Sequence, residues 1–278
     1  MGLRGCKRGI MKRIIAFLLI LITSTPAFAR DYTADSGCLA AWLFKEGSGT
    51  TVADSCGHGN TGTFKSSGHP TWSATVPSFH SYGTSANSAS FASGDYINSG
   101  TGSNLNTIPK FTLVAWVYAT GDGGNNRGRI FDKEFAGTSP GGWQIAFDAS
   151  GLHHLSFTVA ATSSMTFISS TALSLNAWHL VVVTWDGSLT ASNSHLYQDN
   201  TEVSYGTQTN GSGSVESDAN NPLAIGNVDD FSSDRTWAGY ISQAAIFNRV
   251  LTTAELTDIY NNGLTGNGSF MKFMGATR

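Results

Sequence analysis

The sequence predicts an all-β protein: a two-sheet antiparallel β-sandwich with one short helix near its C-terminal end. Three observations lead to this prediction. Many short segments rich in β-branched and aromatic residues alternate with turn residues along the chain. Only 13% of the residues are charged, and Gly, Ser, Thr and Asn take their place, as in many turn-rich extracellular domains. A single segment near the end has apolar residues at helical spacing.

The most informative segment is WHLVVVTWDG at residues 178–187. Side chains alternate along a strand, so Val181 and Val183 face one side, while Leu180 and Val182 face the other. Both faces are largely apolar, which predicts a strand covered by protein on both sides. A short buried helix has a similar composition, but the β-branched content and the closing Asp-Gly turn favour a strand.

The N-terminal third contains short strands separated by turns. Residues 65–87, rich in Ser, Gly and Pro, are interpreted as a long ordered loop. Ala89–Phe91 and Tyr96–Ile97 are interpreted as a short hairpin about Gly94-Asp95. The other strands expected here are residues 39–44 and 61–64.

The remaining strands are separated by turn residues in the same way. Residues 129–133, 141–147 and 154–159 predict three strands in meander order, because turn residues separate them. Thr252 to Tyr260 predicts the helix, with a Thr N-cap and an acidic first turn. Further strands are expected at residues 111–118, 195–197, 202–203, 222–226 and 237–247.

The first 29 residues predict a secretory signal peptide. Five basic residues precede an apolar run of nine residues, Ile14 to Ile22, and Ala27-Phe28-Ala29 supplies small residues for cleavage after Ala29. The run is too short to span a bilayer, so no membrane span is expected after cleavage. The protein is therefore expected to be secreted, with residues 30–37 as a lead-in and 264–278 as a flexible tail.

The charge balance of the mature chain narrows its partners. Five of the 16 basic residues lie in the leader and none of the 19 acidic ones do, which leaves 11 basic against 19 acidic residues, formally −8. Nucleic acid is therefore an unfavourable partner. A cation such as calcium is compatible with this balance.

Two cysteines remain after the leader is removed, Cys38 and Cys56. An even pair in an exported domain predicts a disulfide, which adds roughly 3 kcal/mol of stability in the chain-entropy model. The alternative is two free thiols.

With these segments placed, the chain resembles the laminin-G-like, concanavalin-A-type jelly-roll domains. The resemblance covers residues 38–263 and implies one jelly-roll domain, but not one function, because this fold carries many roles. The matching pieces, in the family's order, are AWLFKEGSGTTVADSCGHGNTGTF at 41–64, FTLVAWVYAT at 111–120, RIFDKEF at 129–135, GWQIAFDASGLHHLSF at 142–157, WHLVVVTWDG at 178–187, HLYQDNTEV at 195–203, and LAIGN at 223–227 with WAGYISQAAIFNRVLTTAEL at 237–256.

The resemblance implies a calcium site where the opening loop meets the last strand. Asp54 and Asn60 offer side-chain oxygens, and Gly57 and Gly59 are candidate carbonyl donors. The alternative is a plain turn capped by Asp54. The closing block also departs from the family, because Ser242-Gln243 stands where acidic residues are common. We therefore expect weak binding if calcium binds here.

The resemblance also implies glycan recognition, non-catalytic, on the concave sheet or at its loop rim. Candidate ligand-binding residues are Arg129, Asp132, Lys133, Trp143 and His153, because aromatic rings stack on sugars while charged groups bond their hydroxyls. A polysaccharide or a glycoprotein glycan is the expected partner.

Trp143 has an alternative role in the core. The sequence leaves both roles open, because Gly141-Gly142 is expected to leave the surroundings of the ring open. For His153-His154, adjacent strand positions face opposite ways, so shared ligation of one ion is not expected.

Two other function classes stay open. An adhesive or structural protein would bind another protein through its loops and expose an apolar patch. A polysaccharide-degrading enzyme would need clustered acids, but Asp132-Lys133-Glu134 lacks the third carboxylate of the Glu-x-Asp-x-x-Glu pattern. No nucleophile elbow indicates a Ser–His–Asp triad. The sequons at Asn210 and Asn267 have meaning only in a eukaryotic host.

Overall fold

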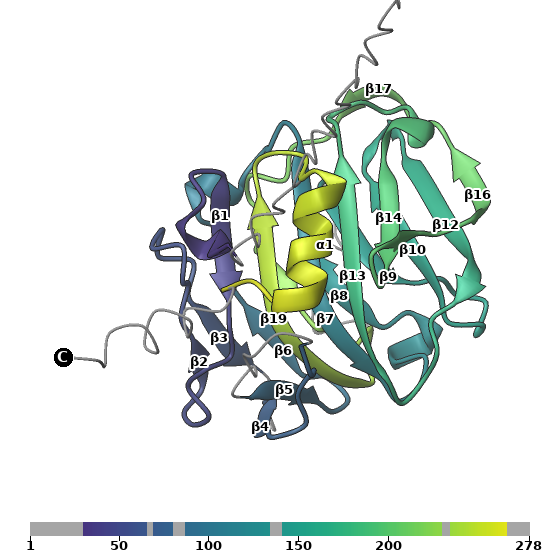
Figure 1. Cartoon of the computed structure of the whole chain (residues 1–278). Helices are drawn as coiled ribbons and strands as arrows, with labels where there is room; N and C mark the ends of the chain where they lie inside the picture. The colour runs from purple at the N-terminus through teal and green to yellow at the C-terminus, as the bar shows by residue number, and fades with distance from the viewer. Residues whose placement is uncertain (1–29, 66–68, 80–86, 134–140, 230–233, 266–278) are drawn as a thin grey trace, which may run out of the picture.

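The computed structural model describes residues 30–65, 69–79, 87–133, 141–229 and 234–265, and the predicted signal peptide lies outside them. The described residues form two large antiparallel sheets that pack face to face, with one α-helix on the outside (Figure 1). The predicted all-β class, antiparallel sandwich and short C-terminal helix are confirmed.

Sheet A has the order β15-β14-β13-β7-β19-β5-β4, and β1 also pairs with β19. Its strands are β1 (Cys38–Trp42), β4 (Thr71–Ser73), β5 (Ser88–Phe91), β7 (Phe111–Ala119), β13 (Trp178–Trp185), β14 (His195–Gln198), β15 (Thr201–Glu202) and β19 (Gly239–Phe247).

Sheet B has the order β16-β12-β10-β9-β8-β18-β6-β3-β2, in which β8, β9 and β10 form the predicted meander. Its strands are β2 (Thr51–Val52), β3 (Gly62–Lys65), β6 (Tyr96–Asn98), β8 (Arg129–Asp132), β9 (Trp143–Phe147), β10 (His154–Val159), β12 (Met165–Ala172), β16 (Tyr205–Thr209) and β18 (Ala224–Ile225). A small third sheet pairs β11 (Ala161–Ser163) with β17 (Ser212–Val215). The helices are α1 (Thr253–Asn262) and the short 3-10 turns η1 (Tyr32–Ala34), η2 (Ser103–Leu105), η3 (Gly124–Asn126) and η4 (Ala191–Asn193).

Strand β13 is covered on both faces, as its sequence predicts. Val181 and Val183 lie in the core between the sheets. Leu180 and Val182 lie in a second apolar cluster on the outer face of sheet A, together with Ile259 of α1. Helix α1 lies across that face (Figure 1). The outer face can therefore be apolar because the helix removes it from water.

The turn after β5 corrects the predicted hairpin about Gly94-Asp95. Strand β5 pairs with β4 and β19 in sheet A, whereas β6 pairs with β3 and β18 in sheet B. The turn is closed by the amide of Ala92, which donates to Oδ2 of Asp95 at 2.8 Å. A tight turn therefore moves the chain from one sheet to the other, which local turn signals do not distinguish from a hairpin.

Several strands were not expected from the sequence. The loop expected at 65–87 contains β4, and β11, β12, β16 and β17 lie in segments rich in Ser, Thr and Gly. All residues of β17 are exposed, as are four of the five in β16. Strands β16 and β17 lack the alternation of apolar and polar residues that marks a half-buried strand, since no buried face demands it.

The predicted disulfide joins Cys38 of β1 to Cys56, with Cα atoms 5.9 Å apart. It ties the first strand of sheet A to the turn that follows β2. The bridge therefore fixes the opening segment of the sandwich.

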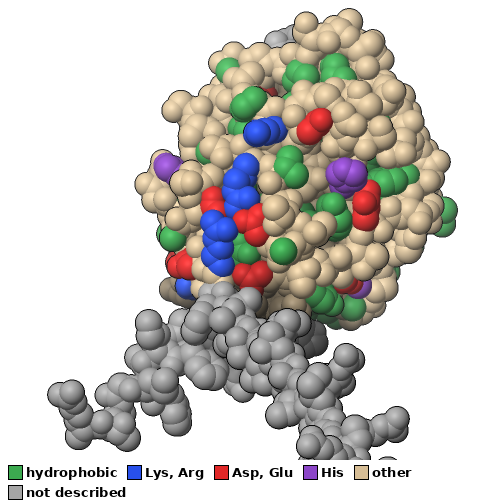
Figure 2. Space-filling view, turned by 45° about the horizontal axis from the view of Figure 1, so that its top comes forward, with side chains coloured by type: hydrophobic (Ala, Val, Ile, Leu, Met, Phe, Trp, Pro, Cys, Tyr) green, Lys and Arg blue, Asp and Glu red, His purple; other side chains and the backbone are tan. Residues whose placement is uncertain are grey.

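A charged network fastens α1 to the sheet. Arg249 donates to Asp35 at 2.7 Å and to Glu255 at 2.7 Å, and Arg30 also contacts both acids. Glu255 closes a capping box with Thr252 at the start of α1. Figure 2 shows a patch where Lys and Arg side chains alternate with Asp and Glu.

These contacts lower the pKa of both carboxylates. Hydrogen bonds from Arg249 lower the pKa of Glu255 to about 2, and hydrogen bonds from Thr252 add to the effect. The hydrogen bond from Arg249 also lowers the pKa of Asp35. Each folded-state pKa is depressed, so the network stabilises the fold above the ordinary carboxyl pKa.

We predict that the free energy of unfolding falls as the pH drops from about 4.5 towards 2, because Glu255 takes up a proton more readily in the unfolded chain. Glu255→Gln should lower stability by about 1–3 kcal/mol at neutral pH, after solvent screening, and flatten the acid slope. Urea unfolding at a series of pH values measures both. Glu46→Gln, at an exposed turn, is the control, and equal slopes in wild type and Glu255→Gln would contradict the assignment.

Candidate functional site

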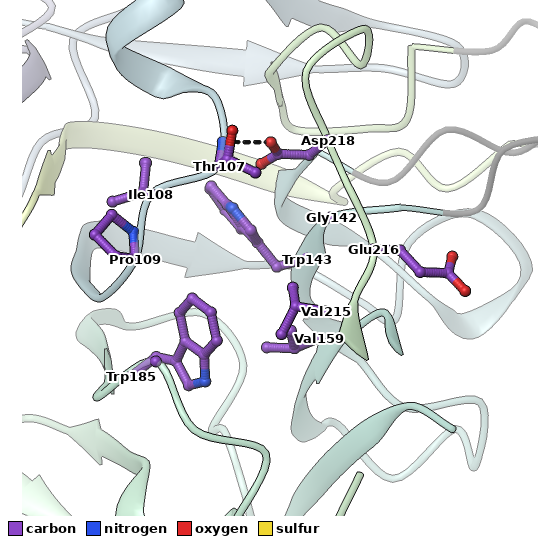
Figure 3. Close-up of a pocket in the computed structure, with 11 residues that line it drawn as sticks. Thr107, Ile108, Pro109, Gly142, Trp143, Val159, Trp185, Val215, Glu216 and Asp218 are labelled. Carbon is purple, nitrogen blue, oxygen red and sulfur yellow. Dashed lines mark hydrogen bonds between the residues drawn. The ribbon is translucent and has the colours of Figure 1, made fainter. Parts of the chain in front are cut away.

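A pocket of about 280 Å³ opens at one end of the sandwich, where loops of both sheets meet (Figure 3). Trp143 comes from sheet B and Trp185 from sheet A. The complete lining is Thr107, Ile108, Pro109, Gly142, Trp143, Val159, Trp185, Gly187, Val215, Glu216 and Asp218. Most of these side chains are apolar, as is usual for small-molecule sites.

The two indoles form the floor of the pocket. The Phe111 ring packs between them, with its centroid 5.0 Å from each. Trp143 is 3% exposed and Trp185 is 4% exposed, so both are core residues that show only an edge to the pocket. The core role left open for Trp143 is therefore the one it has in the fold.

The indole nitrogens differ in their bonding. Nε1 of Trp185 donates to the carbonyl of Ser188 at 2.7 Å. Nε1 of Trp143 is buried and has no hydrogen-bond partner within the described residues. A buried N–H without an acceptor costs free energy, so Nε1 of Trp143 is an unsatisfied donor of the core.

Gly141 and Gly142 do not leave the surroundings of Trp143 open, and that expectation was wrong. A Cβ on Gly141 would lie 2.2 Å from the Ser217 carbonyl oxygen, and one on Gly142 would lie 2.2 Å from the Lys133 carbonyl oxygen. Gly142 also has a φ of +109°. Glycine is required here because two backbone segments pack against β9.

Lys133 fastens the segment that forms the mouth of the pocket. Its side chain is fully buried, and Nζ donates to Oδ1 of Asn106 at 3.1 Å and to the carbonyls of Asp218 and Asn221 at 3.1 and 2.8 Å. Burial lowers the pKa of Lys133, and the charge of Asp218 opposes this shift. The side-chain amide of Asn221 donates in turn to the carbonyl of Lys133, through Nδ2, at 3.2 Å.

Asp218 lies at the edge of the pocket. Its Oδ1 accepts a hydrogen bond from the amide of Thr107 at 2.5 Å, and its Oδ2 lies 3.9 Å from Nζ of Lys133. Figure 3 shows the carboxylate of Glu216 directed away from the indoles. The pocket therefore combines an apolar floor with one carboxylate and the exposed Thr107 at its rim.

The other predicted ligand-binding residues do not join this pocket. Arg129 and Asp132 pair with each other, with Nε 2.9 Å from Oδ2, and both are buried. His153 occupies a turn with φ of +59° before β10, and its Nε2 lies 3.1 Å from Oδ1 of Asp122. The sequence-predicted set is thus divided among separate places: Trp143 in the pocket floor, Lys133 buried outside the pocket lining, Arg129 with Asp132, and His153 with Asp122.

The residues proposed for calcium form a closed turn. Oδ1 of Asp54 accepts from the amides of Ala41 and Cys56, and Oδ2 accepts from those of His58 and Asn60, all at 3.0–3.1 Å. Four N–H donors use the acceptor capacity of the carboxylate.

The remaining members of that set are also engaged. The side-chain nitrogen Nδ2 of Asn60 donates to the carbonyl of Leu39 at 2.9 Å. Gly57 and Gly59 adopt φ of +80° and +82°. Gln243 accepts a hydrogen bond from the amide of Leu264 through its Oε1. As the turn stands, this donor set does not fit a calcium ion.

No group of three or more His, Cys, Asp or Glu side chains suited to a metal occurs in the described part of the chain. Glu134, the second carboxylate considered for a glycosidase, lies outside the described residues, as does the sequon at Asn267. The described helices also lack the length and apolar character needed to cross a membrane.

Residues 91–257 match the family model described as the concanavalin A-like lectin/glucanases superfamily, a laminin G family. The match covers more than half of the chain, and the chain belongs to this family. The resemblance inferred from the sequence is thereby confirmed. Comparison with curated proteins finds no match.

Solved structures with the same fold come from proteins of several kinds. Domain 4 of AbnA, a GH43 extracellular arabinanase from Geobacillus stearothermophilus, in complex with arabinotriose, is 16% identical, with a TM-score of 0.56 over 80% of this chain and 98% of that one. The binding domain of Paraclostridial Mosquitocidal Protein 1 is 14% identical, with a TM-score of 0.56 over 81% of this chain and 52% of that one.

Trypanosoma rangeli sialidase, in complex with sialic acid, is 14% identical, with a TM-score of 0.53 over 81% of this chain and 33% of that one. This chain therefore spans about half of the toxin domain and a third of the sialidase. At these identities the likeness establishes the fold.

We predict that Lys133→Met destabilises the protein by about 3 kcal/mol, because it removes the three hydrogen bonds that the buried ammonium group donates to Asn106, Asp218 and Asn221. It should also speed proteolytic cleavage within residues 216–221. Urea unfolding and limited proteolysis measure the two effects. Lys110→Met, at an exposed position, is the matched control, and equal stability of the two variants would refute the role assigned to Lys133.

Proposed function

We propose that this protein is a secreted carbohydrate-binding module and that the pocket of Figure 3 holds one neutral sugar residue without catalysing a reaction on it. The observation that carries the proposal is a pocket floored by Trp143 and Trp185 and edged by Asp218. Membership of the lectin/glucanase superfamily and the arabinotriose complex of a protein with the same fold support it.

The chemistry of the pocket suits a sugar ring. Indole edges and the side chains of Val159 and Ile108 offer apolar contact to the C–H face of a pyranose or furanose. Hydroxyls of the sugar can donate to the carboxylate of Asp218 at the pocket edge. A small number of polar groups on an apolar wall is enough to fix the orientation of a ligand.

The volume and charge of the pocket narrow the ligand. About 280 Å³ lies at the lower end of the usual range for small-molecule sites, which suits one ring at a chain end rather than a long polymer. Among the described residues that line the pocket there is no Lys, Arg or His, while Asp218 brings a carboxylate to it. A neutral sugar is therefore favoured over one that carries a carboxylate.

Val215 allows the site to be closed without altering the core. It lines the pocket from β17 and is 39% exposed. Val250, at 42% exposed, lies just before α1 and outside the pocket lining, so it is a matched control.

We predict that a glycan array retains the wild-type protein on neutral glycans, that Val215→Trp loses at least ten-fold in affinity, and that Val250→Trp binds like wild type. Arrays run with calcium and with a chelator distinguish glycan binding that needs a metal ion from binding that does not. We expect equal binding in the two conditions. Absence of binding to every glycan in both conditions would remove the proposal. Binding that Val215→Trp leaves intact would move the site elsewhere.

A further inference from the structure

Ser174, His179 and Asp199 form a continuous hydrogen-bonded chain at the surface. Oγ of Ser174 lies 2.8 Å from Nε2 of His179, and Nδ1 of the same ring lies 2.6 Å from Oδ2 of Asp199. A hydroxyl, an imidazole and a carboxylate in this order have the geometry of an activated nucleophile, its base and the group that orients the base.

The strand pairing of sheet A holds the carboxylate in place. Asp199 lies in the turn between β14 and β15, with φ of +51°. Its Oδ1 accepts from the amide of Leu180 at 3.0 Å, and its own amide donates to the carbonyl of Leu180 at 2.9 Å. Oδ2 is thereby aimed at His179, the second residue of β13.

In this hydrogen-bonded chain the imidazole of His179 is shielded from solvent, whereas the hydroxyl of Ser174 is accessible. His179 is 7% exposed, whereas Ser174 is exposed in the loop between β12 and β13. With Asp199 accepting from Nδ1–H, the lone pair of Nε2 is directed to the Ser174 hydroxyl; this tautomer is assigned from the hydrogen-bond network. Nε2 also lies 3.1 Å from the carbonyl of Ser174, which can accept a hydrogen bond from Nε2–H once the ring is protonated.

We propose that Ser174 is an activated nucleophile and that the protein hydrolyses small, accessible acyl esters such as acetyl esters. Ser174 lies outside the pocket lining of Figure 3, so this activity is independent of the sugar site. A small acyl group matches a nucleophile on an exposed loop, because it needs no deep acyl site.

The reaction balances with water as the only co-reactant. Oγ of Ser174 bonds to the acyl carbon while its proton passes to Nε2 of His179. The ester C–O bond then breaks, and the departing alkoxide takes that proton and leaves as an alcohol. Water attacks the acyl carbon next, its proton passes through Nε2 to Oγ, and the carboxylic acid is released. Asp199 acts as a positioning residue, because it touches His179 and not the ester.

The competing explanation is that these hydrogen bonds only hold the loop between β12 and β13 against sheet A. The variant Asp199→Asn distinguishes this structural role from a catalytic one. Oδ1 of the asparagine must still accept from Leu180, so its amide N–H would face Nδ1 of His179. The hydrogen bond survives, but the ring is forced into the other tautomer, with its proton on Nε2. The melting temperature should therefore not change, whereas Nε2 of His179 loses the lone pair that accepts the proton of Ser174.

The test treats the full chain with a fluorophosphonate, locates the adduct by peptide mass spectrometry, and follows p-nitrophenyl acetate hydrolysis. We expect an adduct on Ser174, turnover above the buffer rate, and a loss of at least 100-fold in Ser174→Ala and Asp199→Asn with unchanged melting temperatures. Ser170→Ala, also at an exposed serine, should behave as wild type. No adduct on Ser174, or turnover equal in wild type and Ser174→Ala, would overturn the proposal. So would full reactivity in Asp199→Asn.

Discussion

Sheet A carries apolar side chains on both of its faces, so it must be covered twice. Val181 and Val183 of β13 face the second sheet, and Leu180 and Val182 face the cluster that includes Leu256 of α1. Removing the helix would expose that second cluster to water, at about 25 cal/mol for each Å² of apolar surface. The position of α1, the charged network that fastens it and the anchored N-terminal segment all follow from this requirement.

Two charged groups of the fold illustrate different uses of burial. The Arg249 network is partly exposed, and its carboxylates keep their charge because guanidinium groups surround them. Lys133 is fully buried, which disfavours its charge, yet three oxygen acceptors surround its ammonium group. The first fastens a helix to a sheet, and the second fastens a loop to a strand end. The second contact is the one that shapes the candidate sugar pocket.

Much of the fold could be predicted from the sequence, because buried strands leave strong patterns. Strand β13, the meander and the capped helix follow from periodicity and turn residues. Strands such as β16 could not be found, because exposure on both faces removes the pattern. The site was harder still, since its parts are far apart in sequence. Asp199 reaches His179 only through the register of β13 with β14, and Asp218 reaches Lys133 across 85 residues.

The most direct test of this account is native-state hydrogen exchange of sheet A. If the double cover of β13 supports the whole structure, the amides of Leu180, Val181 and Val182 should exchange only through global unfolding, with the same free energy as urea denaturation gives. The exposed edge strand β16 should exchange far earlier by local opening. Exchange of the β13 amides at rates similar to those of β16 would contradict the account.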